Sequence, residues 1–180
     1  MKVIFLDRDG VINRDRPDHV KAWSEFEFLP GSLEAIRLLS NNGYSIILIT
    51  NQSAVNRRLI TEKGLAIIHE RMIRRIEETG GRIEAIYFCP HTPDQGCECR
   101  KPKPGLIYKA QADYKLDLSK TCMIGDSLKD IECGWKAGCG KTVLVRTGKG
   151  KKTEPLLQKD GPKPDFIADD LLAAGKWLLT

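Results

Sequence analysis

Uninterrupted apolar runs alternate along the chain with segments in which apolar residues recur every three or four positions. The uninterrupted runs are rich in β-branched and aromatic side chains and stop abruptly at polar residues, as strands buried on both faces of a parallel sheet do. They predict strands over residues 1–6, 44–50, 83–88, 121–124 and 142–145, with a short further strand after Asp165.

The intervening segments predict amphipathic helices. Ser32 is the expected N-cap of one helix, and Thr61 is that of a longer helix closed by Gly80-Gly81. Further helices are expected from about Leu106 to Lys115, after Asp126 and at the chain end, whereas residues 149–163, rich in Gly, Lys and Pro, are expected to form a loop. Alternating strands and helices predict an α/β fold, a parallel sheet with helices on both faces.

Composition narrows the class of protein. The chain has 180 residues, 41% hydrophobic and 29% charged, which fits a single domain over 1–180. No apolar run approaches the ~18 residues of a membrane span, and the N-terminal run is too short for a signal peptide, so a cytoplasmic protein without a membrane partner is expected.

The net charge of +5 is weak evidence for a nucleic-acid partner. Much of it comes from two clusters that fit a solvated loop and an exposed helix face. These clusters are Lys149, Lys151 and Lys152, and Arg71, Arg74 and Arg75. Because no basic patch interleaved with aromatic residues is present, no nucleic-acid partner is expected, although a zinc-bearing nucleic-acid module remains an alternative.

Carboxylates and a hydroxyl follow the predicted strands where each ends. Asp7 and Asp9, then Gly10, follow the first strand; Thr50 ends the second; Asp126 follows the fourth. Because ligands of open α/β sheets bind outside the carboxyl ends of the strands, these side chains are candidates for one site. Asp130, four residues after Asp126, has two interpretations, a further member of the site or a cap of the next helix.

A cluster of soft metal ligands lies in a Pro/Gly-rich loop at residues 89–99. Its spacing is C-x-H followed by C-x-C, which can close four ligands around a tetrahedral zinc and leaves no position open for water. The ligands are Cys89, His91, Cys97 and Cys99. A structural Zn²⁺ is therefore expected, with reduced, unliganded cysteines as the alternative. The zinc would give Arg100 and Lys101, which follow directly, a rigid base.

In this order, Asp7-x-Asp9-Gly10, Thr50, Lys101 and Gly125-Asp126-x-x-x-Asp130 resemble the motifs of the haloacid dehalogenase (HAD) superfamily of phosphotransferases. The zinc loop leading into Arg-Lys-Pro, together with Thr50-Asn51-Gln52-Ser53, resembles the branch that holds heptose bisphosphate and histidinol phosphate phosphatases. The resemblance implies a Rossmann-like HAD fold, and no segment is long enough for a large cap domain.

The resemblance also implies a mechanism. Asp7 would be the nucleophile and Asp9 the general acid and base, with Thr50 and Lys101 stabilising the phosphoryl group. Mg²⁺ would be held by Asp7, the Asp9 backbone carbonyl and Asp126, with Asp130 behind them. Lys103 competes with Lys101 for its role, and Lys101 is preferred because proline follows it directly and again two positions further on.

Substrate contacts are implied for two further stretches and for Arg100. These positions are Asp15, Arg16, Pro17 and Asp18, then Asn51, Gln52 and Ser53. A guanidinium at Arg100 could grip a second phosphate bidentately. The expected activity is removal of the 7-phosphate of a heptose 1,7-bisphosphate, on the route to the nucleotide-activated heptose of lipopolysaccharide, by a monomer. The alternatives are a histidinol phosphate phosphatase and phosphotransfer at a nucleic-acid end.

Overall fold

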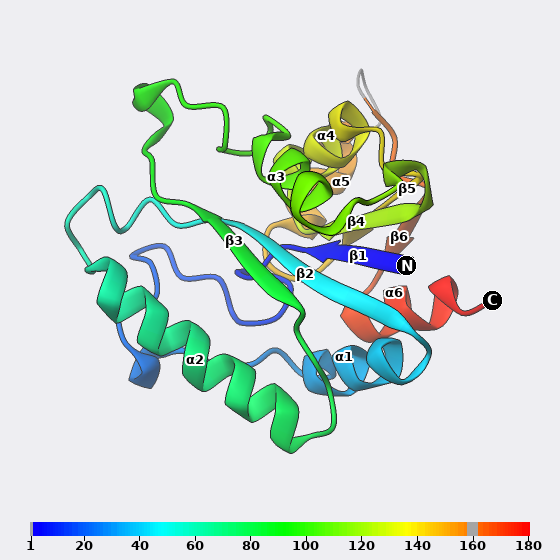
Figure 1. Cartoon of the computed structure of the whole chain (residues 1–180), viewed down its shortest axis with the longest axis horizontal. Coiled ribbons are helices and arrows are strands. Elements are labelled where there is room, and N and C mark those ends of the chain that lie inside the picture. Colours follow the sequence, from blue (N-terminus) through cyan, green and yellow to red (C-terminus); the bar gives the residue numbers. More distant parts are fainter. Residues whose placement is uncertain (1, 158–161) are drawn as a thin grey trace.

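The computed structural model describes residues 2–157 and 162–180, and its centre is a parallel sheet of six strands (Figure 1). The strands are β1 (Lys2–Leu6), β2 (Tyr44–Asn51), β3 (Ala85–Cys89), β4 (Thr121–Gly125), β5 (Lys141–Val145) and β6 (Phe166–Ala168). Their spatial order is β3-β2-β1-β4-β5-β6. The prediction of a parallel α/β sheet is therefore confirmed, with strand ends shifted by one or two residues.

Helices cover both faces of the sheet, as predicted. The α-helices are α1 (Ser32–Asn41), α2 (Glu62–Glu78), α3 (Gly105–Tyr114), α4 (Leu128–Ala137), α5 (Gly150–Leu157) and α6 (Leu171–Leu178). Short 3-10 turns lie at Trp23–Glu25, Pro93–Gln95 and Leu118–Lys120. Helices α1, α2 and α6 pack on one face, and α3 and α4 pack on the other (Figure 1).

Strand β1 shows why its uninterrupted apolar run is needed. Ile4 and Leu6 face the cluster formed with α1, α2 and α6, whereas Val3 and Phe5 face α3 and α4. All four side chains are almost fully buried, because alternate residues of a strand point to opposite faces. Each such side chain stabilises the fold by about 1.5–3 kcal/mol.

Two local predictions about helix starts had different outcomes. Thr61 caps α2 as predicted, its hydroxyl accepting from the Gly64 N–H at 3.0 Å. The prediction for Ser32 is wrong by one residue: α1 begins at Ser32, and its N-cap is Gly31, which has φ of 77° and makes no side-chain cap hydrogen bond. Glycine adopts that left-handed backbone without steric cost.

The prediction of a loop over 149–163 is wrong for its first half, which forms α5; residues 158–161 lie outside the described part of the chain. Leu157 of this helix packs with Ile131 and Leu144. That burial outweighs the low helix propensity of the glycine and proline residues. Gly150 is required at the helix start, because a Cβ there would lie 1.8 Å from the Val145 carbonyl oxygen.

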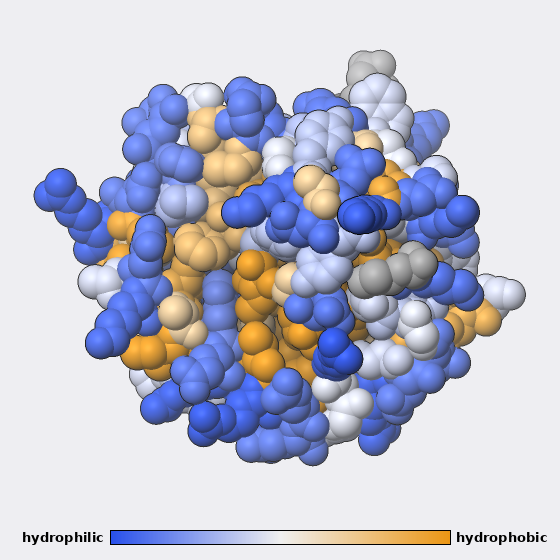
Figure 2. All heavy atoms as spheres, viewed as in Figure 1, coloured by the Kyte–Doolittle hydropathy of each residue, from blue (hydrophilic) through white to orange (hydrophobic). Residues whose placement is uncertain are grey.

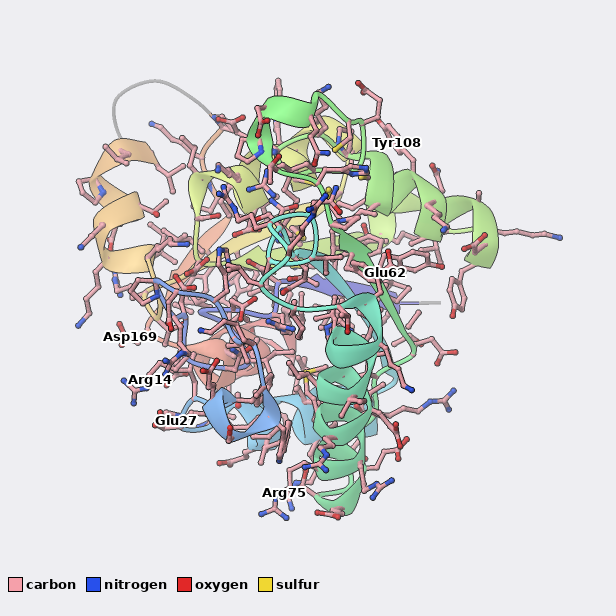
Figure 3. All side chains as sticks on the ribbon, turned by 90° about the vertical axis from the view of Figure 1, so that its left-hand side faces the viewer. Arg14, Glu27, Glu62, Arg75, Tyr108 and Asp169 are labelled. Atoms are coloured by element: carbon pink, nitrogen blue, oxygen red, sulfur yellow. The ribbon has the colours of Figure 1, made fainter. Side chains whose placement is uncertain are left out.

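Residues 11–30 form a pinned loop that folds back over the carboxyl end of β1. Asn13 forms an isolated antiparallel bridge with Phe28. Next to it, Arg14 Nε lies 3.0 Å from Glu27 Oε2, and the two side chains can be seen pointing toward one another in Figure 3. This loop is held at both ends, so that the residues between them keep a fixed place beside the sheet.

Strand β3 is an edge of the sheet and is only half-buried over most of its length.

Figure 2 shows hydrophobic residues at the centre of one face of the molecule, bordered by hydrophilic ones. None of the helices within residues 2–157 and 162–180 is both long and apolar enough to cross a bilayer.

We expect Gly134→Ala to destabilise the fold, because α4 lies very close to the sheet. A Cβ at Gly134 would lie 2.7 Å from Met123 Cβ and 2.9 Å from Thr142 Cγ2. The clash should cost about 1–3 kcal/mol, more than the gain of about 1 kcal/mol in helix propensity. Denaturant unfolding measures the difference. The adjacent Trp135→Ala, at a residue 65% exposed, should change stability by less than about 0.5 kcal/mol. An unchanged or raised midpoint for Gly134→Ala would contradict the packing described.

Candidate active site

The candidate site lies where the strand order reverses, at the carboxyl ends of β1 and β4. From β1 the chain moves outward to β2 and β3 on one side, and β4 to β6 fill the other. Ligands of such sheets bind at this switch point. A cleft of about 750 Å³ opens there, and Asp7, Asp9, Lys101, Asp126 and Asp130 line it.

A buried ammonium group holds two of the carboxylates. Lys101 Nζ lies 2.9 Å from Asp7 Oδ1 and 2.6 Å from Asp130 Oδ1, and it donates to the Ile49 carbonyl oxygen at 2.7 Å. The Lys101 side chain is 2% exposed. Burial alone would lower the pKa of Lys101, but Asp130 and Asp7 outweigh it and hold that pKa above its usual value. The lysine is therefore a fixed positive charge at the floor of the cleft.

Around Lys101, the carboxylates nevertheless outnumber the positive charges. Asp7, Asp126 and Asp130 each place an oxygen within 4.8 Å of the others. Burial, and then the neighbouring carboxylates, raise the pKa of Asp126 to about 8. Burial also raises the pKa of Asp7 to about 6, against the opposing effect of Lys101. Clustered carboxylates whose ionisation is disfavoured are a fitting site for a hard divalent cation such as Mg²⁺.

Glycines make room for this cluster. A Cβ at Gly10 or at Gly148 would lie 2.1 Å from Asp126 Oδ2, and both residues have positive φ. The Lys149 N–H donates to the same oxygen at 2.8 Å. Asp130 also closes a capping box with Ser127 at the start of α4, so both interpretations of Asp130 apply at once.

The Asp9 carboxylate lies in the opposite electrostatic setting. Its Oδ1 accepts from Arg8 Nη2 at 3.0 Å and Asn13 Nδ2 at 2.9 Å, and its Oδ2 accepts from Gln52 Nε2 at 2.8 Å. Burial alone would raise the pKa of Asp9, but Arg8 and the two amides hold it below its usual value. Asp7 and Asp9, two residues apart, thus have pKa values shifted in opposite directions.

The residues after β2 serve the neighbouring groups. Gln52 Nε2 joins the Thr50 hydroxyl to Asp9, and Thr50 is fully buried and does not line the cleft. Asn51 accepts from the Lys101 N–H at 3.1 Å and donates to the Lys101 carbonyl oxygen at 3.2 Å. Asn51, Gln52 and Ser53 all line the cleft.

The pinned loop supplies one wall of the cleft. Asp15, Arg16 and Pro17 line it, and Asp15 Oδ2 lies 3.0 Å from Lys149 Nζ. Asp18 is exposed and does not line the cleft; its carboxylate is 2.7 Å from Lys21 Nζ and 3.2 Å from Nε of the lining residue Arg16. Its predicted contact with the substrate stays a prediction.

The structure separates the two candidate lysines of the Arg-Lys-Pro-Lys stretch. Lys103 lies outside the cleft lining and pairs with Glu98 at 2.7 Å, whereas Lys101 is at the centre of the carboxylate cluster. Arg100 lines the cleft and donates from Nη1 to the His91 carbonyl oxygen at 2.9 Å, so the metal-ligand loop and the cleft are directly joined.

Three lysines that line the cleft were not predicted as site residues from the sequence: Lys129, Lys149 and Lys152. The last two were interpreted as part of a solvated loop. They follow β5, whose carboxyl end adjoins that of β4, so the strand rule already applied to Asp7 and Asp126 could have found them. The partners of Asp9 were missed as well, because nothing in the sequence indicates which side chains meet a given carboxylate.

The four predicted zinc ligands converge. The three thiol sulfurs lie 3.1–3.6 Å from one another, and His91 Nδ1 lies 3.2 Å from Cys99 Sγ and 3.5 Å from Cys89 Sγ. In a tetrahedral site with Zn–S bonds of ~2.3 Å, neighbouring sulfurs are ~3.8 Å apart. The cluster therefore fits a zinc ion after small side-chain adjustments.

The chain is similar to known phosphatases over nearly its full length. A family model described as HAD-hydrolase-like matches residues 98–174. D-glycero-beta-D-manno-heptose-1,7-bisphosphate 7-phosphatase of Bordetella bronchiseptica is 43% identical, with 99% of this chain and 98% of that protein covered. The enzyme of that name from Neisseria meningitidis serogroup B is 41% identical, with 99% and 95% covered.

Solved structures show the same similarity to phosphatases. The crystal structure of D,D-heptose 1,7-bisphosphate phosphatase from B. bronchiseptica, complexed with magnesium and phosphate, superposes with a TM-score of 0.94 at 43% identity and covers 99% and 98% of the two chains. That from Burkholderia thailandensis gives a TM-score of 0.76 at 34% identity, with 100% and 99% covered. The fold, the clustered carboxylates and this similarity together place the chain in the haloacid dehalogenase superfamily of phosphatases.

Proposed function

We propose that this chain is a Mg²⁺-dependent phosphatase that removes the 7-phosphate of D-glycero-D-manno-heptose 1,7-bisphosphate through an aspartyl-phosphate intermediate. One observation carries the reaction class: Asp7 lies in a cluster with Asp126, Asp130 and Lys101 at the switch point of the sheet. The substrate is the one named for the relatives that match this chain over nearly its full length.

In the first step the Asp7 carboxylate attacks phosphorus, and the bond from phosphorus to the sugar oxygen breaks. A Mg²⁺ held by Asp7, the Asp9 carbonyl and Asp126 would neutralise the charge that otherwise repels an anionic nucleophile from an anionic substrate. Lys101 stabilises the negative charge on the phosphoryl oxygens. The Thr50 hydroxyl accepts from Gln52 Nε2 at 2.9 Å, which leaves its own proton free to be donated to a phosphoryl oxygen.

Asp9 transfers the proton in both steps. In the first step it gives a proton to the leaving sugar oxygen, and in the second it takes one from the water that attacks the aspartyl-phosphate and regenerates Asp7. The hydrogen bonds from Arg8, Asn13 and Gln52 favour the ionised form of Asp9, which is the form that accepts a proton in the second step. The negative charge of an arriving phosphoryl group raises the pKa of a neighbouring carboxyl, which favours the protonated form when the first step requires it.

The rim of the cleft favours a bisphosphate over histidinol phosphate. Arg100, Lys149 and Lys152 line it, opposed by Asp15. A second phosphate would find cationic partners there, and Arg100 could bind it bidentately. Histidinol phosphate instead carries an ammonium group, which these cations would repel.

The zinc ion has a structural role in this proposal. Cys89 ends β3 and Cys99 precedes Arg100, so a tetrahedral Zn²⁺ would tie the loop to the sheet on one side and to Arg100 on the other. All four protein ligands are used, which leaves no position for catalysis.

Turnover of three substrates tests the activity. We expect Mg²⁺-dependent phosphate release with kcat/KM at least about a hundredfold higher for heptose 1,7-bisphosphate than for histidinol phosphate, which is about 2.7 kcal/mol of transition-state binding. Comparing the α and β anomers shows which one the cleft prefers. Arg100→Gln should lower kcat/KM for the bisphosphate and leave that for histidinol phosphate within about threefold. A preference for histidinol phosphate would keep the mechanism and reject the substrate.

Asp7→Asn should abolish release of phosphate from every substrate, because the amide cannot form the phosphorylated intermediate. Circular dichroism and the unfolding midpoint should show a folded variant. Retention of full activity would reject Asp7 as the nucleophile.

The raised pKa of Asp126 makes a stability prediction for metal-free protein. Because that pKa is about 8 in the folded chain against a usual value of 3.8, ionised Asp126 destabilises the fold increasingly as the pH rises through this window. Asp126→Asn should therefore gain stability relative to the wild type between pH 5 and pH 8. Glu34→Gln, at an exposed carboxylate of α1, should show no such trend.

Adding Mg²⁺ should reduce this stability difference between the wild type and Asp126→Asn. At a concentration about a hundredfold above its Kd, it should stabilise the wild type by about 2.7 kcal/mol, with a larger effect at pH 8 than at pH 6, and should not stabilise Asp126→Asn. Thermal unfolding with and without Mg²⁺ at the two pH values measures both effects. Equal stabilisation of the two proteins would exclude Asp126 as a ligand.

Cys97→Ser should remove zinc, because it deletes one of four ligands. Bound zinc per chain should fall well below that of the wild type by elemental analysis. Activity should fall with it, since Arg100 and Lys101 follow the last ligand directly. Cys122→Ser replaces a buried thiol that packs on the opposite face of the sheet from Cys89 and should keep the zinc. Unchanged zinc content and kinetics in Cys97→Ser would contradict the anchoring role.

A further inference from the structure

The guanidinium of Arg8 is buried beneath the catalytic cleft. Arg8 stands between Asp7 and Asp9 in the sequence, and its side chain is 0% exposed. Nη2 donates to Asp9 Oδ1 at 3.0 Å, Nη1 lies 3.1 Å from His69 Nε2, and the guanidinium carbon lies 6.0 Å from the centre of the Phe26 ring. Burying a guanidinium is costly, and an apolar side chain of similar size would often be as stable, which indicates a role beyond packing.

The contact between His69 and Arg8 fixes the state of the imidazole. Burial, and then the charge of Arg8, lower the pKa of His69 to about 3, so the ring is neutral near pH 7. Since Arg8 can only donate, Nε2 must be the accepting nitrogen and Nδ1 must carry the proton. The imidazole is thus a neutral acceptor that holds one arm of the guanidinium.

The Asp9 carboxyl is the far end of this connection. His69 lies near the middle of α2, which begins at Glu62 and has Arg75 in its last turn, both labelled in Figure 3. Arg8 therefore links this helix, which covers one face of the sheet, to a side chain at the end of β1. Asn13 shares Oδ1 with Arg8, and Gln52 holds Oδ2, so the carboxyl is held from both sides.

We propose that Arg8, itself held by His69, is a positioning residue that aims the Asp9 carboxyl for both proton transfers. This inference rests on the proposed function, in which Asp9 is the acid and then the base. Proton transfer requires hydrogen-bond reach, and a displacement of about 1 Å can cost a hundredfold in rate. Loss of the imidazole acceptor would let the guanidinium turn and release Asp9 Oδ1 without touching substrate or metal ligands.

The dependence on the leaving group distinguishes positioning of Asp9 from a general structural effect. A sugar alkoxide needs a proton to leave, whereas p-nitrophenolate is a stable anion and leaves without one. With enzyme in excess and saturating Mg²⁺, release of the leaving group, the dephosphorylated sugar or p-nitrophenol, in a single turnover reports only the first step. Single-turnover rates on heptose 1,7-bisphosphate and on p-nitrophenyl phosphate are therefore compared for each variant.

For His69→Leu we expect the first-step rate on the heptose substrate to fall at least about tenfold, with the rate on p-nitrophenyl phosphate within about twofold of the wild type. His69→Gln, whose side-chain oxygen can accept from Arg8, should recover most of the loss. Ile73→Ala, one turn along α2, should leave both rates unchanged. Arg8→Met should show the same selective loss, and the His69 variants decide the question if it does not fold.

In an Asp9→Asn background, His69→Leu should have no further effect on the heptose substrate, because the group it positions is gone. Equal losses on the two substrates, no loss on either, or additive losses with Asp9→Asn would overturn the inference. Failure of the proposed substrate has a separate sign: wild-type protein would turn over p-nitrophenyl phosphate and not the heptose bisphosphate. Steady-state turnover of p-nitrophenyl phosphate, which needs Asp9 as the base, then tests the inference, and it should fall in His69→Leu and recover in His69→Gln.

Discussion

A single buried ammonium group among three carboxylates is the interaction on which the site depends. Lys101 reaches Asp7, which follows β1, and Asp130, which lies in the first turn of α4. Without the lysine, bringing them within reach of one another in a buried cleft would be strongly unfavourable. With it, the cluster still carries excess negative charge, which is what prepares it for a divalent cation. The sheet supplies the geometry, since β1 and β4 are neighbours and both end at this point.

The position of Lys101 is in turn fixed from two directions. Asn51, at the end of β2, binds both the N–H and the carbonyl oxygen of Lys101, and the Ile49 carbonyl accepts from its ammonium group. On the other side, Arg100 is bonded to the backbone of the metal-ligand loop at His91. Lys101 lies on an irregular segment, but these contacts hold it in place as firmly as strand pairing would.

Much of this arrangement could be predicted from the sequence, because strands with uninterrupted apolar runs indicate where their polar ends must meet. Asp7, Asp126 and the loop ligands of the zinc cluster follow from that rule or from local spacing. Helix α5 could not be predicted, since its stability comes from burying Leu157 against Ile131 and Leu144, which are distant in sequence. Two contacts around Asp9 are of the same kind: Gln52 is 43 residues from Asp9 and His69 is 61 residues from Arg8, and no local pattern joins either pair.

Two carboxylates separated by one residue need opposite environments if one is to attack and the other to exchange protons. Asp7 is buried, and other carboxylates lie beside it, so the free protein disfavours its charge despite Lys101, and a bound cation would favour the ionised nucleophile. Asp9 faces Arg8 and two amides, so its charge is favoured until an anionic substrate arrives. Substrate and metal therefore shift the two acids in opposite directions, each toward the form that its step requires. The guanidinium of Arg8, which stands between them in the sequence, pairs with Asp9 and not with Asp7. This difference separates the nucleophile from the proton-transfer group within three residues of the chain.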